Sequence, residues 1–261
     1  MTSIGDKAFE GCIGLTSINI QNGVTTIGKF AFMNCESLIS VNMPNSVTLI
    51  SDGVFSDCNS LTTINIPDGV TSIGSSAFSD CCSLTSIAIP SSVISIGYEA
   101  FDSCVCLTSI EIPNSVTSIE DRAFRGCTGL TSIEIPNSVT SIGYYAFQGC
   151  TGLTSIEIPS SVTSIGGHVF GGCTGLATIK VESKRPAAAQ YDMADGIYDT
   201  CTLYVPEGSE NAYYVAEGWS EFKNIVTYST EPNTKVPQDV NGDGVVDSQD
   251  VLEIYQYMQE H

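Results

Sequence analysis

The acidic stretch DVNGDGVVDSQD, residues 239–250, carries the clearest chemistry in the sequence. Side-chain oxygens fall at loop positions 1, 3, 5, 9 and 12, and the residue at position 7 offers its backbone carbonyl. Gly244 stands at position 6, where a calcium loop turns sharply. Ca²⁺ prefers oxygen ligands in this arrangement. The stretch therefore predicts a calcium site with the ligands Asp239, Asn241, Asp243, Val245, Asp247 and Asp250.

This loop differs from an ordinary EF-hand loop in two respects. Position 12 is Asp250 where an EF-hand has Glu, and no helix pattern precedes the loop. In both features residues 239–261 resemble a dockerin segment, in which a calcium loop leads into one helix, here about residues 248–259. The resemblance implies a cohesin-like protein partner, with Ser248 and Gln249 at the positions that select it. A dockerin carries two such segments and this sequence has one, so cohesin binding stays open while calcium binding is expected.

The other candidates for chemistry are few. The two histidines, His168 and His261, have no nucleophile motif such as Gly-x-Ser-x-Gly around them, and no pair of carboxylates stands out for glycoside hydrolysis. We therefore expect no enzyme activity. Twenty-nine acidic residues against nine basic ones give a net charge near −20, which argues against nucleic-acid binding because phosphate contacts need clustered Lys and Arg. No run of about 18 apolar residues predicts a membrane span.

Eight of the eleven cysteines recur every 23 residues, at Cys12, Cys35, Cys58, Cys81, Cys104, Cys127, Cys150 and Cys173. Parallel side chains about 4.8 Å apart exceed the Cβ separation of about 3.5–4.5 Å in a disulfide, so we expect a ladder of buried free thiols. Cys82 and Cys106 lie outside this ladder and are 24 residues apart, which places them on adjacent coils offset by one position. Whether these two cysteines are bridged stays open.

The elements that position these residues are repeats. Seven full units begin at Val24, Val47, Val70, Val93, Val116, Val139 and Val162, and residues 2–23 supply most of an eighth. A fixed period of this length predicts a solenoid, whose coils fold only when neighbours stack on them. In each unit Leu-x-x-Ile-x-Ile-Pro predicts a short parallel strand, and Ala-Phe-x-x-Cys predicts a tight helical turn with its Phe inside. We expect a right-handed, mostly β solenoid of about eight coils with short helical turns.

The period fails after Lys180, and the chain divides there. We assign residues 1–181 to the solenoid, 182–226 to a β/α C-terminal cap, 227–238 to a linker and 239–261 to the calcium loop and its helix. In the cap, residues 202–205 predict a strand, and Ser209 and Gly218 predict the ends of a helix. We interpret Trp219 as a packing anchor of the lid that an open solenoid end needs.

The unit LTSIEIPNSVTSIGYYAFQGCTG, residues 130–152, resembles the BspA-like leucine-rich repeats of the Treponema pallidum type. The resemblance covers residues 2 to about 181 and recurs in every coil. It implies a bacterial protein that is secreted or displayed on the cell surface, with an adhesion or other binding role and no chemistry. We expect its signal peptide to lie upstream of Met1.

Two sets of surface residues are candidates for contact with a partner. The residue between the two isoleucines of each strand faces outward, and the acidic members of this column are Glu111, Glu134 and Glu157. Stacked carboxylates repel one another and favour a cation or a basic partner, whereas the alternative is a solvated strand face. Tyr98, Tyr144 and Tyr145 occupy the variable pair before Ala-Phe, where we expect exposed aromatics that contact glycan or protein, or that are scattered surface tyrosines.

Two functions follow from these patterns. The first is a non-catalytic extracellular binding or adhesion module that recognises protein or glycan and carries a calcium-binding, dockerin-like tail. The second is an accessory subunit of a polysaccharide-degrading assembly, docked through that tail. We also expect the edge of the first coil, residues 2–23, to be unprotected and to favour end-to-end self-association.

Overall fold

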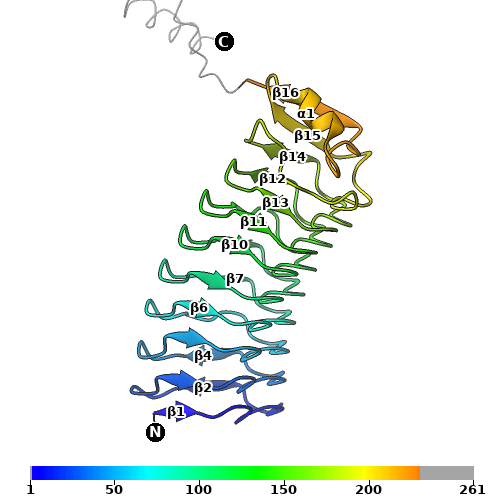
Figure 1. The fold of residues 1–261 in the computed structure, drawn as a ribbon. Coiled ribbons are helices and arrows are strands. Elements are labelled where there is room, and N and C mark those ends of the chain that lie inside the picture. Colours follow the sequence, from blue (N-terminus) through cyan, green and yellow to red (C-terminus); the bar gives the residue numbers. More distant parts are fainter. Residues whose placement is uncertain (1, 230–261) are drawn as a thin grey trace, which may run out of the picture. The chain divides into compact units, whose positions relative to one another are not determined.

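The computed structural model describes residues 2–229 and shows a solenoid of short strands that follow one another coil by coil (Figure 1). The strands are β1 (Ser3–Ile4), β2 (Ser17–Asn19), β3 (Thr26–Ile27), β4 (Ser40–Asn42), β5 (Leu49–Ile50), β6 (Ser72–Ile73), β7 (Ser86–Ile87), β8 (Ser95–Ile96), β9 (Ser109–Ile110), β10 (Ser118–Ile119), β11 (Ser141–Ile142), β12 (Ser155–Ile158), β13 (Ser164–Ile165), β14 (Thr178–Val181), β15 (Thr202–Pro206) and β16 (Asn224–Tyr228). The single helix in this part of the chain is α1 (Glu210–Val215).

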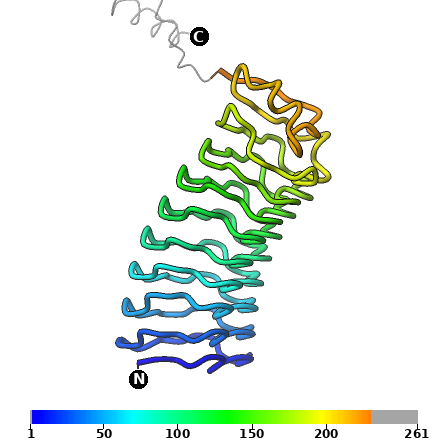
Figure 2. Tube along the Cα trace, viewed as in Figure 1, coloured from blue at the N-terminus to red at the C-terminus, as the bar shows by residue number. Residues whose placement is uncertain are grey.

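The strands form two parallel ladders in which equivalent residues of successive coils face one another. The first ladder contains the Ile-x-Ile segments and includes β2–β4, β7–β9 and β12–β14–β15–β16. The second contains the Ser-Ile segments and includes β1–β3, β5–β6–β8 and β10–β11–β13. Ser118 pairs with Ser141 and Ser141 with Ser164, so the register equals the sequence period. This arrangement confirms the predicted mostly β, parallel solenoid (Figure 2).

One apolar core runs through the coils. Phe9, Phe32, Phe55, Phe78, Phe101, Phe124, Phe147 and Phe170 stack in one column, with ring centroids of neighbours 5.2 to 6.0 Å apart. The ladder cysteines from Cys35 to Cys173 are buried beside them as free thiols. Each of these thiols donates to the backbone carbonyl of the Phe 26 residues earlier, at Sγ···O distances of 3.0 to 3.2 Å. The thiols therefore serve the core as small side chains whose one donor is satisfied.

The Ala-Phe segments are not helical, and the predicted helical turns need this correction. Each turn contains two residues with left-handed backbone four positions apart, such as Phe30 (φ 57°) and Asn34 (φ 57°), or Glu99 (φ 55°) and Ser103 (φ 59°). Left-handed residues interrupt a helix, because its hydrogen bonds require continuous right-handed backbone. Alternate amides instead reach the next coil, as from Phe30 N to Asp52 O at 2.9 Å. Inter-coil hydrogen bonds thus continue through the turns on this side, which we call the turn face.

The cap covers the last coil, and its carbonyl groups accept hydrogen bonds from the backbone amides that point out of that coil. On the turn face, His168 N, Phe170 N and Gly172 N donate to three backbone carbonyls of residues 192–195 at 2.7 to 3.2 Å. Trp219 is buried, and its Nε1 donates to Ala187 O at 2.8 Å, so the predicted anchor is confirmed. Ser209 stands at the N-cap of α1, although its hydroxyl bonds the Pro206 carbonyl and not a helix amide.

The cap extends further than the sequence predicts. β16 pairs with β15 as a last parallel strand that ends at Tyr228, two residues inside the predicted linker. The Tyr228 hydroxyl donates to Val181 O at 2.8 Å. The compact unit accordingly ends at Tyr228, because main-chain pairing continues through residues whose polarity had suggested a linker.

Candidate binding surfaces

The exposed residues between the paired isoleucines form one column along the first ladder, and we call this side the strand face. At both ends of the column, side chains from adjacent coils form favourable polar contacts. Asn42 Nδ2 donates to Asn19 Oδ1 at 2.7 Å, and Lys180 Nζ contacts Glu157 Oε1 at 2.5 Å. In the middle, Glu111 pairs in register with Glu134, and within residues 2–229 neither side chain forms an ion pair. Two like charges directly opposite each other destabilise a sheet slightly and leave a negative potential there.

A groove of about 550 Å³ lies on the strand face beside this column. Its carboxylates come from Glu134, Glu157 and Glu182, and amide and hydroxyl groups lie between them. The carboxylate of Glu182 accepts a hydrogen bond from Ser160 N at 3.2 Å, which fixes one wall. The ammonium of Lys180 is held at Glu157, and this hydrogen bond raises the pKa of Lys180 above its ordinary value. One carboxylate of the groove, that of Glu157, is therefore already paired with a cation of the chain itself.

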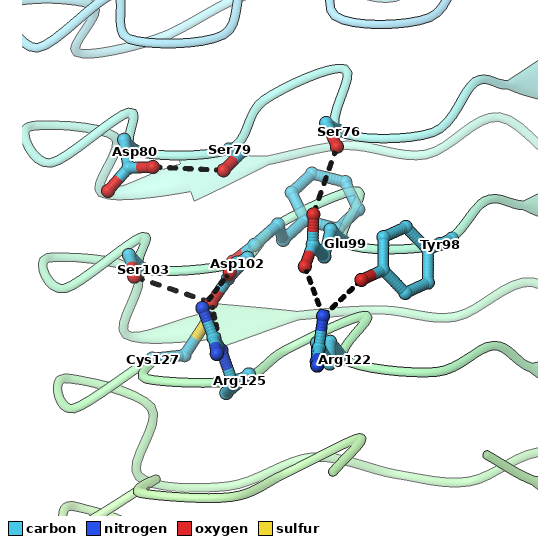
Figure 3. Close-up of polar contacts among 11 residues, drawn as sticks. Ser76, Ser79, Asp80, Tyr98, Glu99, Asp102, Ser103, Arg122, Arg125 and Cys127 are labelled. Atoms are coloured by element: carbon cyan, nitrogen blue, oxygen red, sulfur yellow. Dashed lines mark hydrogen bonds and ion pairs between the residues drawn. The ribbon is translucent and has the colours of Figure 1, made fainter. Parts of the chain in front are cut away.

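The turn face, in contrast, is filled by contacts between its own side chains (Figure 3). Arg122 Nη1 contacts Glu99 Oε1 at 2.9 Å and also donates to the Tyr98 hydroxyl. The guanidinium lies over two rings, 5.5 Å from the centroid of Tyr98 and 5.4 Å from that of Tyr145. Partial burial acts to raise the pKa of Glu99, but hydrogen bonds from Tyr98 and Arg122 outweigh it and hold that pKa below its ordinary value.

The same row of contacts continues to the cap. Tyr145 stacks on His168 with ring centroids 5.1 Å apart, and His168 Nε2 lies 3.0 Å from Asp192 Oδ2. Beside this row, Arg125 holds the buried carboxylate of Asp102 with two hydrogen bonds of 2.9 and 2.6 Å. Successive coils on this face therefore carry residues that complement each other.

The predicted aromatic contact residues have different environments. Tyr98 and Tyr144 are exposed, at 39% and 44%. The Tyr144 hydroxyl accepts a hydrogen bond from Gln190 Nε2 at 2.6 Å, next to a groove of about 360 Å³ that also includes Glu120 and Asp121. Tyr145 is only partly exposed, contrary to expectation, because Arg122 and His168 cover its two faces.

The predicted calcium ligands Asp239, Asn241, Asp243, Val245, Asp247 and Asp250 lie outside the described residues, as do Ser248 and Gln249. Within residues 2–229, no group of three His, Cys, Asp or Glu side chains is arranged to hold a metal ion. In the same range no helix has the length and hydropathy of a bilayer span.

Sequence reasoning missed the turn-face network of Glu99, Asp102, Arg122, Arg125 and His168. A signal for part of it was present, because Glu99 and Arg122, and likewise Asp102 and Arg125, carry opposite charges 23 residues apart. In a solenoid, that spacing places two side chains on adjacent coils. The same spacing places Tyr145 on the coil after Arg122, but it does not show that the ring covers the guanidinium, because ring placement depends on side-chain rotamers.

Comparison with known proteins gives a consistent family. The model of the BspA type Leucine rich repeat region matches six copies within residues 1–106 and 94–191. The crystal structure of the T. pallidum Leucine Rich Repeat protein (TpLRR) is 30% identical, with a TM-score of 0.52 over 67% of this chain and 72% of that chain. The pneumococcal vaccine antigen PcpA is 18% identical, with a TM-score of 0.54 over 87% of this chain and 71% of that one, and shows the same fold. No curated protein matches the chain.

Proposed function

Because the chain belongs to the BspA-type leucine-rich repeat family, we propose that it is a bacterial binding module secreted or displayed on the cell surface, where it mediates adhesion to protein or glycan. Solenoids of this kind are generally non-catalytic scaffolds that offer a long surface to a partner. The observation that carries the proposal is the strand-face groove, which combines a volume of about 550 Å³ with three carboxylates.

The charges of the groove indicate what a ligand should contribute. Glu134 has no cationic neighbour among the ion pairs of residues 2–229, whereas Glu157 binds Lys180. A ligand that brings an ammonium or guanidinium group to Glu134 would repeat the contact that Lys180 makes one coil away. Charge complementarity of this type increases association rates and selects partners.

Binding of the full chain to a peptide array and to a glycan array tests this proposal. The peptide array contains lysine peptides and the same peptides with acetylated lysine. We expect binding to lysine peptides that weakens in 0.5 M salt, roughly in line with screening at a Debye length of a few Å. Glu134→Ala should weaken binding several-fold, and Asn65→Ala, in the same column three coils earlier, should leave it unchanged. Equal binding by wild type and Glu134→Ala on both arrays contradicts a role for this groove.

The tail supports a second candidate function. The oxygen ligands of residues 239–250 favour calcium, and the loop resembles half of a dockerin, so the chain would join a polysaccharide-degrading assembly through a cohesin-like partner. Ser248 and Gln249 would then contact that partner. Without metal, the carboxylates repel one another, and calcium would order the loop.

Asp243→Ala separates the two functions. Titration calorimetry should show calcium binding in the wild type and none in Asp243→Ala, while the melting of the solenoid stays the same. Absence of a calcium signal in the wild type contradicts the site. If Asp243→Ala still captures the same binding partners as the wild type in a pull-down, adhesion through the solenoid is favoured. Loss of those partners favours docking through the tail.

A further inference from the structure

The eleven cysteines of the chain fall into two groups. Eight are buried, and burial raises the pKa of their thiols, to about 12 for Cys58 and about 11 for Cys173. Three are accessible, because Cys12 and Cys106 are exposed and Cys82 is partly exposed, although partial burial also raises the pKa of Cys82. Thiols of the first kind are inert, whereas accessible ones react with oxidants. Cys82 and Cys106 are the two accessible thiols that belong to neighbouring coils.

Backbone contacts place residues 24 positions apart side by side at this corner of the solenoid. Ser60 N donates to Glu36 O and Ser83 N donates to Asn59 O, both at 3.1 Å. Cys106 and Cys82 occupy the equivalent positions one coil later, although no such bond joins Cys106 N to Cys82 O. Adjacent coils lie about 4.8 Å apart, so Cα atoms offset by one position lie about 6 Å apart, within the range of about 4.4–6.8 Å that a disulfide spans.

Side-chain directions agree with this placement. Gly129 and Val105 are the equivalents of Cys106 and Cys82 one coil later, and a Cβ at Gly129 would lie 2.6 Å from Val105 O. A real Cβ does not lie this near a backbone oxygen, so the Cys106 Cβ has the same neighbour, the backbone of Cys82, at a larger distance. The Sγ of Cys82 lies 3.9 Å from Ser103 O, so its side chain faces the coil that carries Cys106.

We propose that Cys82 and Cys106 are a redox-active pair that a small-molecule disulfide oxidises to a disulfide joining the coils that begin at Val70 and Val93. The exposed Cys106 thiolate attacks the small-molecule disulfide, a mixed disulfide forms, and one small thiolate leaves. The Cys82 thiolate then attacks the Cys106 sulfur and expels the second. The two protein thiols lose two electrons, which reduce the small-molecule disulfide to two thiols, and the two protons pass to those products.

This modification would tether two coils in the middle of the solenoid under oxidising conditions. A disulfide stabilises a fold mainly by restricting the unfolded chain. We therefore expect oxidation to raise the melting temperature, and reduction with dithiothreitol to reverse the change.

Oxidised glutathione added to the full chain tests the pair, with intact mass as the readout. Apart from one glutathione adduct at the exposed Cys12, the wild type should lose two hydrogen masses and gain no further glutathione. Chymotryptic cleavage after Phe78 and Phe101 should yield one cross-linked species. Cys82→Ser and Cys106→Ser should each abolish the cross-link and leave the remaining thiol as a glutathione adduct. Cys12→Ser, which removes an accessible thiol elsewhere, should keep the cross-link.

Three outcomes overturn the proposal. The first is two separate glutathione adducts on the wild type without a cross-link. The second is a cross-link that persists in Cys82→Ser, which would show that Cys106 pairs with another thiol. The third is an unchanged mass under excess oxidised glutathione while iodoacetamide still alkylates Cys106, because an accessible thiol would then have no partner in reach.

Discussion

The turn face and the strand face are built from the same coils, yet side chains of adjacent coils attract each other on the turn face and repel each other in the middle of the strand face. On the turn face, Glu99 meets Arg122 and Asp102 meets Arg125, and the partners are close and partly buried. On the strand face, Glu111 meets Glu134, which has the same charge and the same exposure to solvent.

The difference shows how a repeat protein places its charged residues. A strict repeat brings each residue against its own copy, so a charged position repels itself along the solenoid unless the sequence changes from coil to coil. The turn face has changed in this way and stabilises the stack. The middle of the strand face keeps like charges, and its unmatched potential is available to a partner.

The largest effect on stability should come from Arg125→Ala. Asp102 is 4% exposed, and both of its carboxylate oxygens accept hydrogen bonds from Arg125. Removing the guanidinium leaves a buried charge with poorer partners, which we expect to cost about 1–3 kcal/mol in urea unfolding. Gln148→Ala, in the same column one coil later, should change stability by less than about 0.5 kcal/mol. Equal effects of the two substitutions would show that the ion pair contributes nothing.

A smaller effect should follow Arg122→Ala. The guanidinium packs between two tyrosine rings and binds Glu99, and each ring contact at a partly exposed site contributes about 0.5–1 kcal/mol. We expect a loss of about 1–2 kcal/mol in urea unfolding. The stability of Arg122→Lys should fall between those of the wild type and Arg122→Ala, because an ammonium keeps the charge but lacks the planar surface. A lysine variant as unstable as the alanine variant would assign the whole effect to stacking.

Acid should weaken the turn face. Glu99 has a lowered pKa in the folded chain, and the hydrogen bond from Lys29 likewise lowers the pKa of Asp52. A carboxyl with a lowered folded pKa stabilises the fold above its unfolded pKa of about 4, and the stabilisation disappears as pH falls through the folded pKa. Thermal midpoints should therefore drop as pH is lowered below about 5. The drop should be smaller in Arg122→Ala, and an identical drop would exclude Glu99 as a contributor.

The smallest effect on stability is expected at Glu134. Glu134→Ala removes one of two facing like charges, so unfolding should change by less than about 0.5 kcal/mol, in the stabilising direction. Glu157→Ala instead removes the exposed pair with Lys180 and should cost at most about 1 kcal/mol. Thermal melting in low salt compares the two variants. A clear destabilisation by Glu134→Ala would mean that the strand face, like the turn face, is structural.

The sequence by itself determined the period, the parallel stacking and the identity of the core. From the second coil onward the recurring Phe, Leu and Cys positions are buried as their spacing predicts, because a period of 23 residues returns each of them to the same place, whereas Cys12 in the first coil is exposed, contrary to expectation. It also determined the cap anchor Trp219, since a solenoid end must be covered. The calcium loop stays a prediction from ligand spacing.

The tertiary structure alone decided the conformation of the turns and the partners of the polar side chains. Ala-Phe-x-x-Cys has the composition of a helical turn, but alternate amides bond the next coil, so the local preference yields to hydrogen bonds between coils. The period places Arg122, Tyr145 and His168 on successive coils, but only the structure shows that the guanidinium and the imidazole cover the tyrosine ring. Contacts of this kind depend on which residues adjacent coils present and how their side chains turn, and the period of the repeat carries no information about side-chain direction.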